Sequence, residues 1–314
     1  MNPRLLVCAA IAALGLAAPA SAQQRAPGAL DAAKAAAVDA AVNAEIERQK
    51  LVGVAIGVIQ NGKIAYVKGY GLADAEKKAP VTADTVFNWA SNSKPVMAVL
   101  AMQLVEKGLL DLDADVRKYV PEFPESSATI TCRRILCHQS GIPHYSNGKV
   151  LPNPLKHDGA DPRANPVFAI DVFSRSPLLF APGAKTSYST YAFILLSAAV
   201  QAAGGKPIAA QLEERIVKPL GLASFEPDGK TAKPEWSAGY VQRVGRTMRA
   251  SEDAHYWKHG GGAYKSNVRD FARWTAALMN RELMSEKTET AMWTTQPLSD
   301  GKATTWGLGV SVDS

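Results

Sequence analysis

Apolar and polar positions recur along the chain at two spacings, one helical and one extended. Apolar side chains at positions 38, 42 and 46 repeat every four residues after Asp31, which predicts a capped helix with one packed face. Residues 96–105 contain one polar side chain, so they predict a helix that is buried on nearly all sides and ends at Gly108. An apolar run over residues 192–203 predicts a helix that ends at the two glycines after it. Apolar side chains at positions 208, 212 and 216 predict a further amphipathic helix, stopped by Pro219 and Gly221.

Strand signals come early in the sequence. Residues 54–59 and 63–70 are strand-like, and the Asn-Gly pair at 61 and 62 is the strongest short-range indication of a hairpin. Residues 57–63 match the phosphate-binding motif Gly-x-x-x-x-Gly-Lys. However, Ile64 stands where such a loop needs serine or threonine, and no helix follows. Residues 306–314 are also strand-like and are expected to join the hairpin in one antiparallel sheet. We therefore predict an α/β (α+β) fold in which helices flank this sheet and roughly residues 80–250 form an all-helical lobe.

The first 22 residues have the pattern of an export signal. Arg4 precedes an apolar run over residues 5–18, and a small-residue cleavage site ends at Ala22. The mature domain is therefore expected to cover residues 23–314 and to be secreted or periplasmic. The apolar run is too short for a structural membrane span, and we find no longer one in the sequence.

Composition and charge narrow the class of protein. A hydrophobic content of 47% in 314 residues is enough for a large core, which argues against disorder as the main state. The formal net charge of +6 is spread along the chain, so we expect no nucleic-acid partner, although an anionic substrate is compatible with it. Cys132 and Cys137 lie on different faces of a helix-like segment and are expected to be buried free thiols. The oligomeric state stays open.

The candidate chemistry centres on Ser91 and Lys94, three residues apart at the start of the buried helix. This spacing puts both on one helix face, so the amine can reach the hydroxyl. Desolvation and the helix dipole disfavour a charged lysine there, so Lys94 can act as a base and activate Ser91 as a nucleophile. We expect no cofactor and no metal. His255 and His259 are four residues apart, but the glutamate of a His-Glu-x-x-His site is absent and three glycines follow.

The order of motifs around this pair is similar to that of a known enzyme family. Thr-Val-Phe-Asn at residues 85–88 precedes Ser91-x-x-Lys94, and an aliphatic helix, Leu-Leu-Asp-Leu-Asp and Tyr-Val-Pro-Glu-Phe follow it. This succession resembles the penicillin-recognising serine hydrolases, specifically the group of class C β-lactamases, DD-peptidases and β-lactamase-like esterases. The resemblance implies their fold, with Ser91 as the acylated nucleophile and Lys94 as its partner.

The same resemblance implies a third catalytic residue. The relatives carry Tyr-x-Asn at the entry of the second apolar helix, where the tyrosine relays protons with the lysine, and Tyr188 occupies that position. A phenol near an ammonium group is expected to favour its anion. Tyr191 is the competing candidate. Thr190 replaces the asparagine, and because a hydroxyl is shorter than an amide, strong β-lactam turnover is not expected.

Other polar residues have two interpretations each. In the family, a histidine placed like His138 is structural, and a catalytic role is the alternative. His144 and Tyr145 lie in the proline-rich segment 143–166 and either line the substrate cleft or belong to a solvated surface excursion. The glycines at 260–262 are implied to form a close-packed turn before a helix.

One family element has no counterpart in residues 1–314. The strand with Lys/His-x-Gly, which supplies a second oxyanion donor and the groups that hold a substrate carboxylate, is absent. Two interpretations follow: a fragment of a longer enzyme, or a catalytically silent relative that binds a ligand. We expect an exported serine hydrolase that transfers an acyl group to Ser91 from a β-lactam, an ester or a D-amino-acid peptide, without a distinction among the three.

Overall fold

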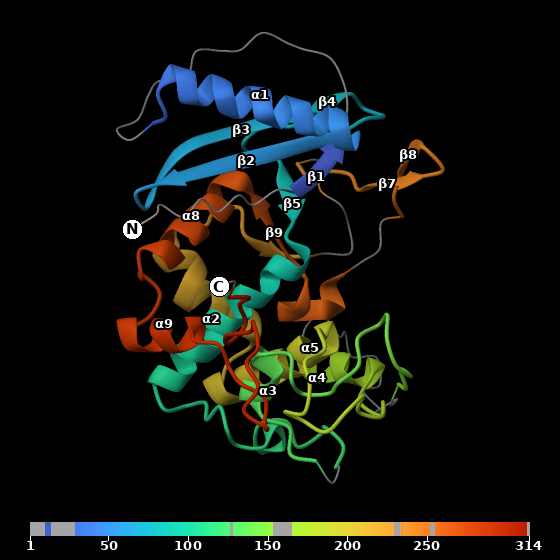
Figure 1. Cartoon of the computed structure of the whole chain (residues 1–314), viewed down its shortest axis with the longest axis vertical. Coiled ribbons are helices and arrows are strands. Elements are labelled where there is room, and N and C mark those ends of the chain that lie inside the picture. Colours follow the sequence, from blue (N-terminus) through green and yellow to red (C-terminus); the bar gives the residue numbers. More distant parts are fainter. Residues whose placement is uncertain are drawn as a thin grey trace.

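A small sheet and a helical lobe lie at opposite ends of the molecule, with α2 running between them (Figure 1). The computed structural model describes residues 10–13, 29–125, 128–152, 165–228, 233, 235–251 and 255–312. The α-helices are α1 Ala32–Gln49, α2 Ser93–Glu106, α3 Cys132–Leu136, α4 Pro166–Ala169, α5 Thr190–Gly204, α6 Ile208–Leu212, α7 Lys218–Leu220, α8 Val268–Met279 and α9 Glu286–Trp293. Shorter helical turns are η1 Ala90–Asn92, η2 Val116–Lys118, η3 Ile170–Val172, η4 Glu213–Val217 and η5 Tyr256–Gly261.

The strands form three separate antiparallel groups in the described residues. They are β1 Ala10–Ala13, β2 Val52–Gln60, β3 Lys63–Asp74, β4 Ala79–Pro80, β5 Val86–Asn88, β6 Glu226–Pro227, β7 Tyr240–Arg243, β8 Arg246–Arg249 and β9 Tyr264–Asn267. The strand orders are β1-β2-β3-β4, β5-β9-β6 and β7-β8. Strand β1 lies inside the expected leader and pairs with β2. Cleavage and export stay predictions.

The predicted hairpin is confirmed as β2 and β3. Asn61 and Gly62 have φ values of 52° and 72°, so both central residues of the turn adopt the left-handed conformation that a two-residue hairpin requires. Side chains alternate between the two faces of β2. Val54 and Ile56 pack against α1, whereas the Cα of Gly57 faces Ala272 of α8, where an added Cβ would lie 3.0 Å from the Ala272 Cβ.

A polar cluster attaches α1 to the sheet. Asp39 of α1 accepts hydrogen bonds from the hydroxyls of Tyr66 and Tyr70 and from the amine of Lys68, the last two at 2.6 and 2.8 Å. The predicted cap is also present, since the Asp31 carboxylate accepts from the backbone N–H of Lys34. The first predicted helix is therefore confirmed.

The core lies in the lobe and along α2. Residues 96–102 are all buried, which confirms the helix predicted to be enclosed on nearly all sides, and Gly108 ends its last turn with a φ of 67°. Helix α5 packs beside α2 and is likewise buried over its first eleven residues. Cys132 and Cys137 are free and buried, as predicted.

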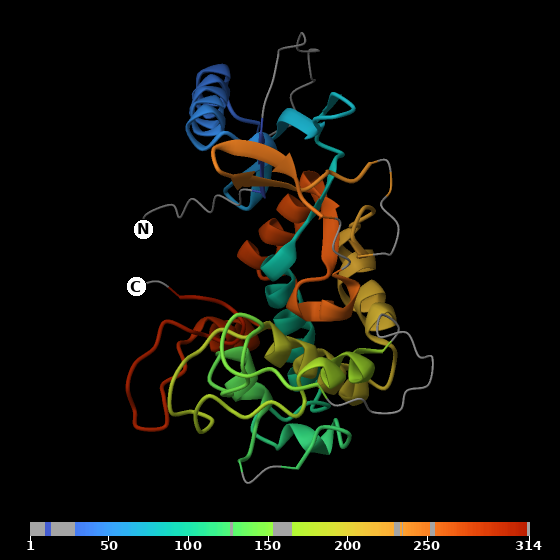
Figure 2. The ribbon, with the colours of Figure 1, turned by 90° about the vertical axis from the view of Figure 1, so that its right-hand side faces the viewer.

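The expectation that residues 306–314 extend the sheet is wrong. In the described part of that segment, the backbone N–H groups of Leu308 and Gly309 donate to carbonyls of Met292 and Leu136 in the lobe. Gly309 has a φ of 84°, and a side chain there would lie 2.2 Å from the Cβ of Ala98 on α2. Figure 2 shows this red segment beside the green elements of the lobe, far from the blue sheet. The glycine therefore permits a tight approach to α2 that a strand in the sheet could not make.

Within the described residues, no single helix has the length and apolar composition of a membrane span. One bent pair, α5 with the helical segment Ile208–Leu220, passes that test only when the two are taken together, and they meet at 76°.

Candidate active site

A strained turn between β5 and α2 carries Ser91. Ala90 has a φ of 46°, and its backbone N–H donates to the Oδ1 of Asn88 at 2.7 Å. The buried indole of Trp89 donates from Nε1 to the Oγ of Ser266 on the neighbouring strand β9 at 2.8 Å. These contacts fix an exposed serine just before the N-terminal end of α2, where the helix dipole favours negative charge.

Lys94 lies one turn further along, with its side chain in the core. Its residue is 3% exposed, and its Nζ lies 3.3 Å from the Oγ of Ser91, 3.3 Å from the Oγ1 of Thr190 and 2.6 Å from the carbonyl oxygen of Gly261. Burial, together with the positive charge of Lys258, lowers the pKa of Lys94 to about 7. A large fraction of Lys94 is therefore an uncharged amine at neutral pH, as a base for Ser91 has to be.

Tyr188 reaches the same point from the entry of α5. Its hydroxyl donates to the Oγ of Ser91 at 2.6 Å, and its ring centre lies 4.7 Å from the Nζ of Lys94. The structure thus brings together the three residues that the sequence selected. Burial raises the pKa of Tyr188 although hydrogen bonds with Ser91 and Thr190 act to lower it, so the expectation that the anion of this phenol is favoured is wrong.

The competing tyrosine belongs to the core. Tyr191 is buried, and its ring stacks on Phe173 with ring centres 4.8 Å apart. Among the described residues, the hydroxyl of Tyr188 and not that of Tyr191 hydrogen bonds to Ser91. Of the two candidates, Tyr188 alone has the geometry of a proton relay.

Two histidines support the tyrosine. His138 is buried, its Nδ1 accepts from the backbone N–H of Ser189 at 3.2 Å, and its ring packs 4.5 Å from that of Tyr188. Burial is the main cause that lowers the pKa of His138 to about 3, and the positive charges of Lys94 and His144 act in the same direction. This imidazole is therefore neutral, and it positions the entry of α5. The geometry favours the structural interpretation of His138.

His144 and Tyr145 border the site. The Nδ1 of His144 accepts from the backbone N–H of Thr190 at 3.2 Å, and its ring lies 5.4 Å from that of Tyr188. Tyr145 is 56% exposed and packs on His144. These contacts favour the cleft-lining interpretation for these two residues, while residues 153–164 of the same segment lie outside the described residues.

The three glycines form the turn that holds Lys94. An added Cβ would lie 2.6 Å from the Cβ of Met97 at Gly260 and 2.9 Å from the Cγ2 and carbonyl oxygen of Thr190 at Gly261. The turn therefore packs directly against α2 and α5, and this close approach aims the carbonyl of Gly261 at Lys94. The sequence marked the turn by its glycine run, but it gave no sign that a backbone oxygen of the turn binds the lysine.

Sequence comparison gives the family. Residues 38–313 match the family described as Beta-lactamase. The chain belongs to the Beta-lactamase family. The resemblance inferred from the Ser-x-x-Lys context is therefore confirmed. Among the described residues of this family member, no three His, Cys, Asp or Glu side chains are grouped so that they could hold a metal.

Relatives within the Beta-lactamase family include hydrolases. Esterase EstB of Burkholderia gladioli is 36% identical over 206 residues, which cover 62% of this chain and 52% of the esterase. The human mitochondrial serine beta-lactamase-like protein LACTB is 26% identical over 290 residues, 72% of this chain and 53% of that protein. The chain spans about half the length of these curated relatives.

Solved structures agree on the fold. One similar structure is that of EstCE1, described as a hydrolase with promiscuous acyltransferase activity. Its TM-score is 0.73 at 20% sequence identity, and the match covers 89% of this chain and 83% of the EstCE1 chain. FmtA from Staphylococcus aureus has a TM-score of 0.74 at 19% identity, and the match covers 93% of this chain and 76% of the FmtA chain. The predicted fold class is therefore confirmed, and the family relatives support a hydrolase of β-lactamase-related type.

Proposed function

We propose that this protein is an exported serine esterase that forms an acyl-enzyme on Ser91. The convergence of three groups carries the proposal: the Tyr188 hydroxyl and the Lys94 amine lie 2.6 and 3.3 Å from the Ser91 oxygen, at the start of a buried helix. A serine hydroxyl becomes a nucleophile when a nearby base takes its proton, and a lysine whose pKa is about 7 can do so at neutral pH.

Acylation begins with proton transfer away from Ser91. The neutral Lys94 accepts the Ser91 proton directly or through the Tyr188 hydroxyl, while the Ser91 oxygen attacks the ester carbonyl carbon. The positive end of the α2 dipole stabilises the negative charge on the carbonyl oxygen. When the carbon–oxygen bond to the alcohol breaks, Tyr188 donates its proton to the departing oxygen and regains one from the Lys94 ammonium.

Deacylation uses the same groups in reverse order. Lys94 is neutral again once the alcohol has left, so Lys94 and Tyr188 can together take a proton from an attacking water molecule. The water oxygen bonds to the acyl carbon, the bond to Ser91 breaks, and Ser91 recovers its proton. The released products are a carboxylic acid and the free enzyme, and no outside electron acceptor or donor takes part.

Thr190 favours an ester over a β-lactam as the substrate. The residue is 2% exposed, and its hydroxyl lies 3.3 Å from the Lys94 amine. A hydroxyl in that place is buried beside the lysine, so it offers no long amide arm that could bind the side-chain carbonyl of a lactam substrate. The identity of 36% with an esterase supports the same choice.

The test compares three substrates on the full-length gene product. We expect a short-chain nitrophenyl ester to be hydrolysed faster than nitrocefin or a D-Ala-D-Ala peptide, and Ser91→Ala to abolish ester turnover and labelling by a fluorophosphonate. Ser311→Ala is the matched control, because this serine is exposed and lies in a different segment of the chain. Faster nitrocefin turnover would refute the ester preference, and an unlabelled wild type would favour the ligand-binding alternative.

Export is the second part of the proposal. The charged start, apolar run and small residues before residue 23 support it. Expression with the native N-terminus should place the protein outside the cytoplasm, with a mature chain that begins at Gln23. A cytoplasmic protein that keeps residues 1–22 would contradict this part and leave the Ser91 chemistry untouched.

A further inference from the structure

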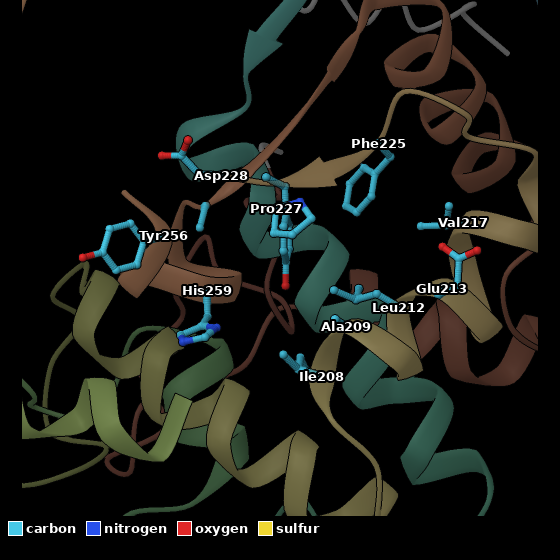
Figure 3. Close-up of a pocket in the computed structure, with 12 residues that line it drawn as sticks. Ile208, Ala209, Leu212, Glu213, Val217, Phe225, Pro227, Asp228, Tyr256 and His259 are labelled. Carbon is cyan, nitrogen blue, oxygen red and sulfur yellow. The ribbon is translucent and has the colours of Figure 1, made fainter. Parts of the chain in front are cut away.

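The hairpin of β7 and β8 lies at the edge of the molecule and forms a two-stranded sheet of its own (Figure 1). Residues 241–249 are all exposed. None of them lines the cavity of about 140 Å³ that Figure 3 shows between the helical segment 208–217 and the segments 225–228 and 256–264. Small molecules bind in concave sites, so a raised hairpin of this kind suits a larger partner.

One face of the hairpin is bound to the body of the protein. Side chains alternate along a strand and cross-strand partners share a face, which places Tyr240, Gln242, Thr247 and Arg249 together. The Tyr240 hydroxyl accepts from the backbone N–H of Ala75 at 2.7 Å, and Arg249 pairs with Glu76 at 2.9 Å. The Gln242 amide donates to the carbonyl oxygen of Lys50 at 2.9 Å. These contacts attach this face to the end of α1 and to the turn after β3.

The opposite face is presented to solvent. It carries two cross-strand pairs, Val241 with Met248 and Arg243 with Arg246. Val241 and Met248 are 37% and 51% exposed, and Val244 at the tip is fully exposed. Among the described residues, no carboxylate lies within ion-pair distance of Arg243 or Arg246. This face therefore combines unpaired positive charge with three exposed apolar side chains.

Two features of this face are unfavourable in water. Arg243 and Arg246 lie directly opposite each other, where like charges repel. Val244 and Gly245 have φ values of 47° and 72°, a turn whose first position favours asparagine, aspartate or glycine over a β-branched residue. Asn61 fills that position in the hairpin of β2 and β3. Departures from local preference concentrate at functional sites, and a partner with negative charge above an apolar layer would offset both of these.

We propose that the solvent-facing side of this hairpin binds the surface of a lipid bilayer that contains anionic phospholipids. The guanidinium groups of Arg243 and Arg246 match phosphate oxygens with two parallel hydrogen bonds each. Val244 at the tip, with the Val241–Met248 pair behind it, enters the boundary between headgroups and acyl chains. A stable protein partner would need about 20–30 residues on this side, far more than residues 241–249 supply, whereas lipids surround an inserted tip from every direction.

The segments that hold the hairpin add to its positive charge. Lys50 and Lys78 are exposed in them, and the two carboxylates there, Asp74 and Glu76, both pair with Arg249. Each lysine or arginine near an anionic leaflet raises the affinity about fivefold. Binding through two arginines and a small apolar tip is therefore reversible and depends on salt.

The test measures sedimentation of the full-length protein with vesicles. Ser91→Ala is used throughout, so that no lipid ester is hydrolysed during the assay. We expect vesicles with about 30% phosphatidylglycerol to bind at least tenfold more tightly than pure phosphatidylcholine at about 0.1 M salt. This advantage should vanish at about 1 M salt, where charges are screened beyond about 3 Å. Equal affinity for the two vesicles at low salt, or no binding to either, would overturn the proposal.

A double arginine variant locates the charge contact. Arg243→Gln with Arg246→Gln should weaken binding to the anionic vesicles about 30-fold. Arg281→Gln with Lys287→Gln is the control, because it removes the same charge near α9, which Figure 1 shows across the molecule from β7 and β8. Equal losses in the two variants would assign the binding to net charge and refute the site. Binding to heparin that needs Arg243 and Arg246, without binding to vesicles, would identify a soluble polyanion as the partner instead.

A variant at the tip separates membrane insertion from a structural role. Val244→Asn introduces a residue that this turn prefers, so the melting temperature should stay the same or rise. The affinity for anionic vesicles should nevertheless fall at least fivefold, because the apolar tip is lost. Undiminished affinity in Val244→Asn would show that the tip does not enter the bilayer and would refute this mode of binding.

Discussion

Replacing Lys258 by glutamine should move the acid limb of the pH profile of ester hydrolysis to higher pH. Lys94 has to be neutral to accept the Ser91 proton, so kcat/KM should fall about tenfold per pH unit below its pKa. Burial and the charge of Lys258 lower that pKa from 10.5 to about 7. At pH 7 about half of the Lys94 side chains are then neutral, against roughly one in three thousand for an ordinary lysine. The shift corresponds to about 5 kcal/mol in favour of the neutral amine.

The sign of the effect follows from the charge. Without the Lys258 ammonium the protonated form of Lys94 becomes less unfavourable, so its pKa rises; hydrolysis slows near pH 6.5 and is unchanged near pH 9. The assay is kcat/KM for a nitrophenyl ester between pH 5 and 9. Lys107→Gln is the control, because it removes the same charge at the other end of α2, about 20 Å away. An acid limb that stays in place or moves to lower pH in Lys258→Gln would refute this account of the base.

Three other changes have expected outcomes. Tyr188→Phe should lower kcat by about 100-fold or more because it removes the proton relay, whereas Tyr191→Phe should leave kcat nearly unchanged, and equal losses in the two would contradict the assignment. Asp39→Asn should lower the free energy of unfolding by about 1–3 kcal/mol in urea titrations at pH 7. Partial burial acts to raise the pKa of Asp39, but its hydrogen bonds hold that pKa below the usual value. The difference in the free energy of unfolding between wild type and Asp39→Asn should therefore shrink as the pH falls through the lowered pKa, and it should not shrink at alkaline pH. Gly309→Ala should destabilise the fold by about 2 kcal/mol or more, and Gly301→Ala, with the same φ of 84° but open space around it, should cost less; equal losses would mean that the contact with α2 is unimportant.

The site could be predicted from the sequence where its geometry is local. Ser91 and Lys94 are three residues apart, so any helix that starts there brings their side chains together, and the apolar run after them made the helix evident. Tyr188 lies 97 positions from Ser91, and no spacing rule connects the two. Only the resemblance to a family with a tyrosine at the entry of a second apolar helix selected it.

Sequence patterns could not predict the roles of residues that act through a backbone atom or whose properties depend on burial. Gly261 binds Lys94 with a carbonyl oxygen, which every residue possesses, so its identity gives no chemical signal. A nearby lysine was expected to favour the anion of Tyr188, but the pKa of this phenol is raised because burial outweighs the hydrogen bonds to its oxygen. The apolar alternation of residues 306–312 suggested a strand, whereas contacts with α2 and α9 turn this segment onto the lobe.

The sequence by itself determined the helices and the hairpin of this protein, because side-chain periodicity and turn residues act over a few positions. It also determined the pairing of a serine with a lysine on one helix face. Only the tertiary structure decided which tyrosine meets that pair and how far the lysine pKa falls. Each of these depends on which distant elements exclude water from a side chain, and that exclusion exists only once α2, α5 and the glycine turn have packed together.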